Sequence, residues 1–299
     1  MSRRSLRAVA VLFILAGVAS SAGAETLPWN IQVDSSFRAE FLFGHQEVRH
    51  LDASVPSTAR FLAGEGLDRF SVNFDPRVPV LAGVVEITPF PTVSGRLAGS
   101  IGVLETSTVE NRRAAASLAG IEWDVKPNYS SWEAAGLYHL WNGGGYRFSV
   151  TAGYRREIWD YRGRPANGNP GSPLHDSFAS SIPFFGLQTA MIFPLWKARF
   201  EVLGSPFMSM NVSDSAQVDS FALQFDGNLY SGGLVEVQME GNTNITPNVL
   251  VGLYSRYAYT ELYGSSSGTG TVADVGLAPY TVFVNQSMAT VGLNVTVFF

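Results

Sequence analysis

Hydrophobic and polar residues alternate along most of the chain with a period of two, which is typical of β-strands. Between residues 29 and 44 the odd positions are mostly apolar, as at Phe37 and Phe41, and polar residues such as Arg38 and Glu40 lie between them. The alternation recurs at Pro79–Ile87, Val93–Val103, Tyr146–Tyr154, Trp196–Val202 and Val235–Glu240. The sequence therefore predicts an all-β protein.

The polar face of these segments is repeatedly charged. Its charged members are Arg38, Glu40, Glu86, Arg96, Glu133, Arg147, Arg155, Lys197, Arg199, Glu201, Glu236, Glu240 and Arg256. In a transmembrane barrel the apolar face of each strand contacts lipid and the polar face lines the interior. Because an unpaired buried charge is costly, we expect these side chains to pair with one another and to plug the lumen.

The last segment is the most specific local pattern. Val291, Leu293, Val295, Val297 and the terminal Phe299 share one face of an alternating strand. A closing strand that ends in phenylalanine resembles the assembly signal of outer-membrane barrels. We therefore assign Val295, Val297 and Phe299 to a signal that the barrel assembly machinery would recognise.

Connections of two lengths set the expected topology, because periplasmic turns are short and extracellular loops are long. Short turns are expected at Pro89–Thr92, Asn142–Gly145, Phe193–Leu195 and Asn242–Asn248, and long loops at His45–Pro76, Glu105–Asn128, Trp159–Ser181, Asn211–Gly227 and Gly264–Asn285. This pattern predicts an antiparallel up-and-down barrel of about ten strands with both termini in the periplasm and five extracellular loops. Residues 119–126 also alternate, so we place them in a β-extension above the membrane and keep twelve strands as an alternative.

The N-terminus carries the features of a secretory signal peptide. Arg3, Arg4 and Arg7 precede an apolar run from Ala8 to Ala19, and small residues follow up to Ala24. We expect cleavage after Ala24, so that residues 1–24 are the signal peptide and residues 25–299 form the barrel. The protein is expected to be exported through the periplasm to the outer membrane of a Gram-negative bacterium.

Composition excludes several partners and frameworks. Without the three signal arginines the chain has 17 basic and 25 acidic residues, a net charge of −8 that disfavours nucleic acid as a partner. The chain has no cysteine, so a disulfide framework is excluded. The histidines are not spaced with carboxylates as a metal-ligand set, and we expect neither a metal nor a cofactor. Aromatic residues near the expected strand ends predict a belt at the membrane interface: Trp141, Tyr146, Trp159, Tyr161, Trp196, Tyr257 and Tyr259.

The order of these segments resembles the omptin family. The resemblance rests on residues 80–102 (VLAGVVEITPFPTVSGRLAGSIG), 146–161 (YRFSVTAGYRREIWDY) and 183–204, and on Thr246-Pro247-Asn248 before the penultimate strand. It implies a ten-stranded outer-membrane barrel with an aspartic-type endopeptidase site at the extracellular end and with bound lipopolysaccharide. For that lipid, Arg155 and Arg156 are the candidate contacts at the outer rim.

The omptin chemistry needs an Asp-x-Asp pair and an Asp-x-His pair that face each other and hold a water. The first position offers Glu122-Trp123-Asp124, and the second offers Asp214-Ser215-Ala216, which has no histidine. Among the remaining histidines, His175 is the candidate base. The resemblance therefore implies Glu122, Asp124, Asp214 and His175 as catalytic candidates in a site that lacks its expected histidine.

The function that the sequence favours is a barrel with a plugged lumen and a surface-binding or structural role carried by its extracellular loops. One alternative is an omptin-like endopeptidase at the barrel mouth, and a second is a narrow channel. The expected partners are outer-membrane lipid, including lipopolysaccharide, and the assembly machinery. We expect a monomer.

Overall fold

The computed structural model describes residues 32–51, 69–103, 108–114, 119–165, 174–218, 221–270 and 275–298. The expected signal peptide, residues 1–24, and the terminal Phe299 lie outside these ranges. The strands are β1 (Gln32–Leu51), β2 (Arg69–Phe74), β3 (Arg77–Phe90), β4 (Val93–Gly102), β5 (Thr108–Ala114), β6 (Ala119–Gly143), β7 (Tyr146–Pro165), β8 (Leu174–Ile192), β9 (Trp196–Ser205), β10 (Ser209–Val218), β11 (Phe221–Thr246), β12 (Val249–Gly270) and β13 (Val275–Phe298). In the described part of the chain no helix is long and apolar enough to span a membrane.

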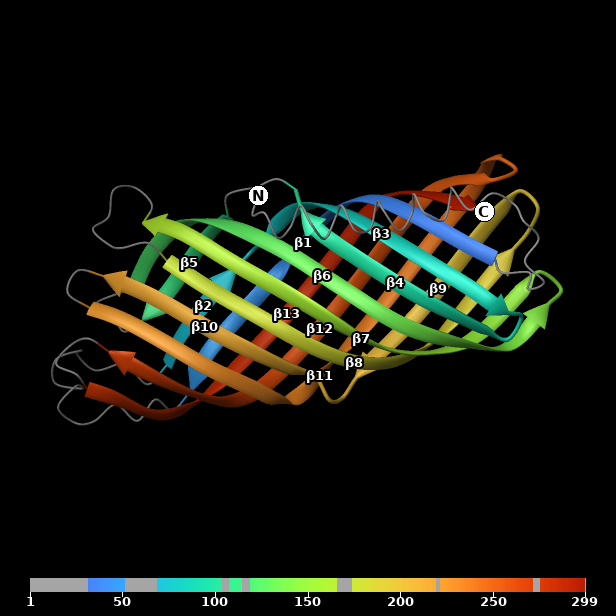
Figure 1. The fold of residues 1–299 in the computed structure, drawn as a ribbon. Coiled ribbons are helices and arrows are strands. Elements are labelled where there is room, and N and C mark those ends of the chain that lie inside the picture. The colour runs from blue at the N-terminus through green and yellow to red at the C-terminus, as the bar shows by residue number, and fades with distance from the viewer. Residues whose placement is uncertain are drawn as a thin grey trace.

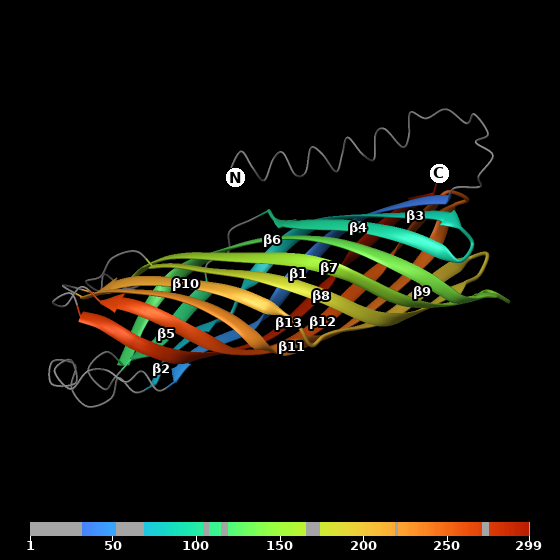
Figure 2. The same cartoon turned by 60° about the horizontal axis from the view of Figure 1, so that its bottom comes forward.

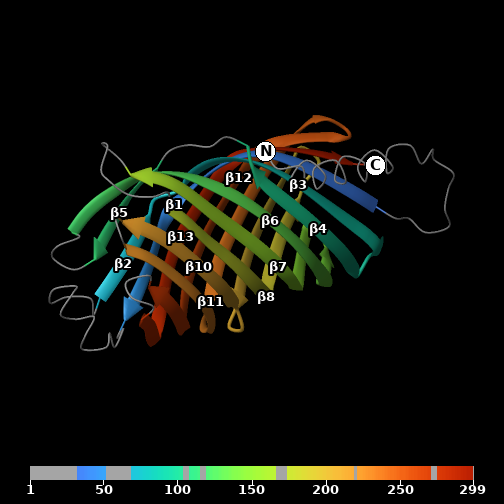
Figure 3. The same cartoon turned by 60° about the vertical axis from the view of Figure 1, so that its left-hand side comes forward.

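These strands form one closed antiparallel barrel with ten wall positions. Strands β2, β5 and β10 continue β3, β4 and β9 in the wall, because each such pair lies against the same neighbour: β1, β6 and β11 respectively. The barrel closes where β13 pairs with β1, from Asp34 opposite Phe298 to Leu51 opposite Thr281. Figure 1 shows the strands running along the whole barrel, and Figure 3 shows near and far strands inclined in opposite senses, as strands of a closed barrel are.

All four expected short turns are at one end of the barrel, the end at which β13 finishes (Figure 1). The turn between β6 and β7 uses Gly144 and Gly145 with φ of 62° and 80°, the left-handed conformation that a two-residue hairpin requires. The turn expected at residues 242–248 narrows to residues 247–248, because β11 continues to Thr246.

The strands run much further into the expected loops than the sequence predicted. Residues 45–51 belong to β1 and residues 211–218 to β10, and residues 119–126 are the first part of β6. The ten-strand count with a β-extension is thus confirmed, and the twelve-strand alternative is wrong. Serine, glycine and asparagine disfavour strands weakly, and pairing with two neighbouring strands overrides that preference. Figure 2 shows β2, β5 and β10 in the extension, at the end opposite the short turns.

The outside of the half nearest the short turns is apolar. Side chains such as Leu81, Leu97, Phe200 and Leu293 are exposed there, in a belt that on β12 runs from Val249 to about Tyr259. A strand needs about 9–11 residues to cross a bilayer, so the 22 residues of β12 reach well beyond it. The interfacial aromatics Trp141, Tyr146, Trp196, Tyr257 and Tyr259 are exposed on this outer face.

Trp159 and Tyr161 do not belong to that belt. Both are buried inside the barrel, at 1% and 0% exposure. Side chains alternate between the two faces of a strand, so every second residue lies on the same face. Trp159 and Tyr161 are therefore on the same face of β7 as Arg155, which points inward. The interfacial prediction was therefore wrong for these two residues.

Candidate functional site

The lumen near the middle of the barrel is filled by a chain of ion pairs of alternating sign. It runs from Glu201 through Arg96, Glu133, Arg155, Glu236 and Arg256 to Glu157, and each link is 2.5–3.0 Å. Arg96 binds Glu201 through two hydrogen bonds, of 2.8 and 3.0 Å. These residues come from β4, β6, β7, β9, β11 and β12, so the chain crosses the barrel from wall to wall.

A second charged group lies beside this chain, toward the short turns. Glu240 accepts hydrogen bonds from Arg38 at 3.0 Å and Arg199 at 2.5 Å, and also from Asn242 and Asn294. The thirteen expected inward charges are confirmed in the interior, and Asp34 and Glu157 join them. The charged layer lines a small cavity of about 60 Å³, which holds a few water molecules at most.

Above the charged layer, toward the extension, the lumen is filled by aromatic side chains. The members of this aromatic plug are Phe74, Tyr129, Trp159, Tyr161 and Phe178, which are all 2% exposed or less. The Phe74 and Tyr161 rings stack at 4.2 Å, and the Trp159 and Tyr161 rings stack at 5.8 Å. Leu42, Val48, Ile182 and Leu262 pack into the same core. Because interiors of this kind are close-packed, the plug separates the charged layer from the far end of the extension.

The aromatic plug was not predicted from the sequence, although the alternation of residues along the strands carries its signal. Val125 and Tyr129 follow the inward parity of Glu133 on β6, as Trp159 and Tyr161 follow that of Arg155 on β7. The inward face therefore changes from charged to apolar along each strand. The prediction treated the whole lumen as charged, so it could not identify the apolar part.

Of the four catalytic candidates, the two with described side chains, Asp124 and His175, face away from the lumen. Asp124 is exposed while its neighbour Val125 is buried in the interior, so the Asp124 carboxylate faces the outside of the wall. Glu122 is two residues away on β6, opposite Asn111, and its side chain is outside the described set. Asp214 lies on β10 opposite Asp176 of β8, and its side chain is likewise not described.

His175 also faces outward, since it is exposed and the following Asp176 is buried. Its Nε2 atom lies 2.7 Å from the Asp160 carboxylate, which also binds Arg162 at 2.9 Å. This is an exposed group on the outer face of β7 and β8. His139, by contrast, lies inside, where Ser94 and Ser149 bind its two ring nitrogens at 2.8 Å.

The two arginines that were expected to contact lipid, Arg155 and Arg156, lie on opposite faces of β7. Arg155 is 4% exposed and binds Glu133 and Glu236 inside the barrel, so its placement at the lipid rim is corrected. The reason is the period of two, which puts consecutive residues on opposite faces of a strand. Arg156 lies on the outer face and donates a hydrogen bond to Ser181 at 2.6 Å.

The expected assembly residues lie on the strand that closes the barrel. Val295 is opposite Phe37 of β1 and Val251 of β12, and Val297 is opposite Ser35 and Val249. Among the residues whose side chains are described, no group of three or more histidine or acidic residues is placed to hold a metal ion.

These features define a class of protein, the closed antiparallel barrel of bacterial outer membranes, here with ten strands. The chain is similar to the outer membrane protease OmpT from Escherichia coli, with a TM-score of 0.75 and 14% identity over 92% of this chain and 99% of that one. The translocator domain of the autotransporter NalP from Neisseria meningitidis also matches, with a TM-score of 0.40 and 10% identity over 97% of each chain. No family model and no curated protein matches the sequence. The omptin-like fold is thus shown by structure alone.

Proposed function

We propose that this chain is an outer-membrane barrel with a closed lumen that acts through its extracellular end, as a surface-binding or structural protein. The observation that supports the proposal is the aromatic plug stacked on the charged layer. The two layers fill the described interior and leave the extension and its loops as the part that can meet other molecules. Binding residues are most often on loops that a rigid scaffold positions.

The proposal includes a route to the membrane. Residues 1–24 would direct export and be removed, and residues 25–299 would cross the periplasm. Val295, Val297 and Phe299 would then be read by the barrel assembly machinery. The barrel would act as a monomer with its five loops on the cell surface.

An endopeptidase at the barrel mouth has less support. A shared water must lie within hydrogen-bond reach of both its base and its carboxylate. The outward positions of Asp124 and His175 put these two groups on the lipid or solvent side of the wall, with the aromatic plug inside it. For lipopolysaccharide, Arg156 remains the candidate contact, because it faces outward above the apolar belt.

Ion conductance in planar lipid bilayers tests the closed lumen. We expect no steady current from the refolded wild-type barrel. Trp159→Ala/Tyr161→Ala should give brief openings, because it removes two of the five plug side chains above the charged layer and connects the small cavity to the outside. The matched control is Trp132→Ala, which removes an exposed aromatic side chain from the outer face and should stay silent.

A steady, reproducible open channel in the wild-type protein would contradict the proposal and favour the narrow-channel alternative. Each variant is first checked for folding by its heat-dependent migration in gels, so that a silent variant is not merely unfolded.

A further inference from the structure

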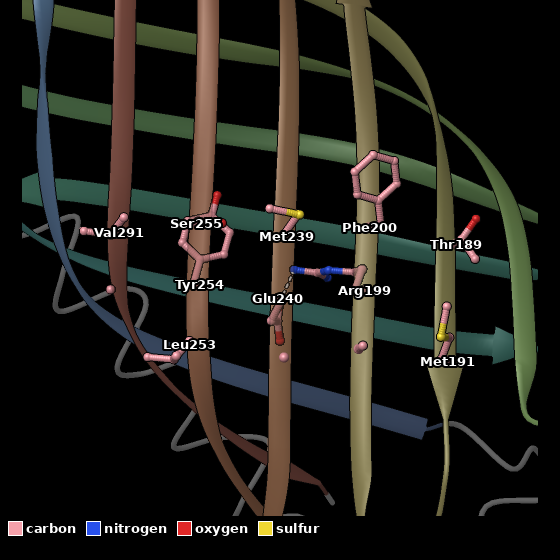
Figure 4. Close-up of a pocket in the computed structure, with 13 residues that line it drawn as sticks. Thr189, Met191, Arg199, Phe200, Met239, Glu240, Leu253, Tyr254, Ser255 and Val291 are labelled. Carbon is pink, nitrogen blue, oxygen red and sulfur yellow. Dashed lines mark hydrogen bonds and ion pairs between the residues drawn. The ribbon is translucent and has the colours of Figure 1, made fainter.

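Two hollows interrupt the apolar outer wall of the barrel. The first has a volume of about 520 Å³ and lies over β8, β9, β11, β12 and β13 (Figure 4). The second has about 480 Å³ and lies over β3, β4 and β6. In the closed order of strands β4 and β11 are five positions apart in either direction, so the hollows are on opposite walls.

Each hollow arises where two small residues pair with each other across neighbouring strands. Ala198 of β9 is opposite Gly241 of β11, and the same row continues to Met191 on one side and Leu253 on the other. In the second hollow Gly95 of β4 is opposite Gly136 of β6. A side chain added at Gly95, Gly136 or Gly241 would meet no atom within 4 Å, so these positions face open space.

Both hollows lie at the same depth. Ala198 is the next outward residue after Trp196, which begins β9, and Gly95 is the next after Val93, which begins β4. Both strands begin at short turns, so the hollows lie in the half of the apolar belt nearest the periplasm, which faces the inner leaflet. Hydrocarbon is the solvent at that depth.

The lining also selects the occupant. The outward-facing side chains around the first hollow are apolar or small, and Figure 4 shows Phe200, Met239 and Leu253 among them. The charged groups of Arg199 and Glu240 bind each other on the inner side of the wall. An uncharged, flexible chain fits such a lining. A second copy fits poorly, because a two-fold contact would place a hollow against itself. The area that two missing side chains leave open is also far smaller than the roughly 800 Å² that each partner buries in a stable protein interface.

We propose that each hollow holds one acyl chain of a resident inner-leaflet phospholipid. Trp196, at 42% exposure, stands at the periplasmic edge of the first hollow, where an indole prefers the interface next to the lipid headgroup. The proposal depends on the place of the barrel in a membrane and not on the role of its extracellular end. Its failure would therefore leave the proposed function untouched.

Filling the hollows separately gives the test. Gly241→Leu and Gly136→Leu place a side chain in the first and second hollow, and the Cβ atom at either position would meet no atom within 4 Å. Gly204→Leu is the matched control, since Gly204 faces outward on β9 above the first hollow and the nearest atom to an added Cβ would be the backbone oxygen of Leu234 at 4.0 Å. The folded proteins are incubated with palmitoyl-oleoyl phosphatidylethanolamine vesicles, extracted in mild detergent, and examined by native mass spectrometry.

We expect wild type and Gly204→Leu to retain one phospholipid for each hollow. Each single variant should lose one of them, and Gly136→Leu/Gly241→Leu should lose both. Equal retention by wild type and the double variant would overturn the proposal. A dimer that Gly241→Leu dissociates would overturn it as well, because the first hollow would then hold a second copy of the chain.

Discussion

At the scale of single residues, the interior depends on matched charges. Arg155 contacts three carboxylates, those of Glu133, Glu236 and Glu157, and Glu236 in turn contacts Arg256. Such buried pairs are weak evidence of net stability, because removing the charges from water is costly. Removing one partner is different, since it leaves the other charge buried and uncompensated.

Glu236→Gln should therefore destabilise the barrel by about 3–5 kcal/mol, because Arg155 and Arg256 both lose a carboxylate partner. The measurement is equilibrium unfolding in urea of the protein refolded in detergent micelles. Glu261→Gln is the control, since Glu261 lies on the outer face and its carboxylate accepts hydrogen bonds from the hydroxyls of Tyr259 and Tyr263. Equal unfolding midpoints for the two variants would contradict the role given to the ion-pair chain.

At the scale of elements, closure of the barrel depends on β13. Strand β13 pairs with β12 on one side and with β1 on the other, so every register error in it would open the barrel. Val295 and Val297, near the end of β13, pair with residues of both β1 and β12. A strand whose two edges are both paired no longer offers an edge to other chains.

Deletion of Phe299 should leave the protein in the periplasm, because the proposed assembly signal loses its terminal aromatic residue. Fractionation of cells followed by immunoblotting measures the distribution between periplasm and outer membrane. Phe43→Ala, which removes an exposed aromatic residue from the outer face of β1, should insert normally. Normal insertion of the deletion variant would remove Phe299 from the signal.

At the scale of the whole molecule, the barrel has two unlike halves. The half with the short turns has an apolar outside and a charged inside, and the extension has a more polar outside and an apolar inside. At about 3.3 Å per residue, the longest strands exceed a hydrocarbon layer of about 30 Å. A hydrocarbon layer of that thickness can surround only one half of the barrel, and we propose that the extension stands outside it.

Because the chain has no cysteine, single cysteines can report this orientation. Ser213→Cys, on exposed β10, should react on intact cells with a maleimide that cannot cross membranes. Asn248→Cys, in a short turn, should react only after the outer membrane is permeabilised. Both positions are exposed, so burial does not explain a difference between them. The opposite labelling pattern would reverse the proposed orientation.

The sequence by itself determined the barrel class, the ten wall positions, the short turns and the inward charges. These follow from the period of two and from turn chemistry, which are local properties of the chain. Only the tertiary structure decided which charges pair and which aromatic side chains, such as Phe74 and Tyr161, stack on one another in the lumen. It also decided the length of the strands and the two outer hollows. These features depend on the register between strands that are far apart in sequence, and no local pattern encodes that register.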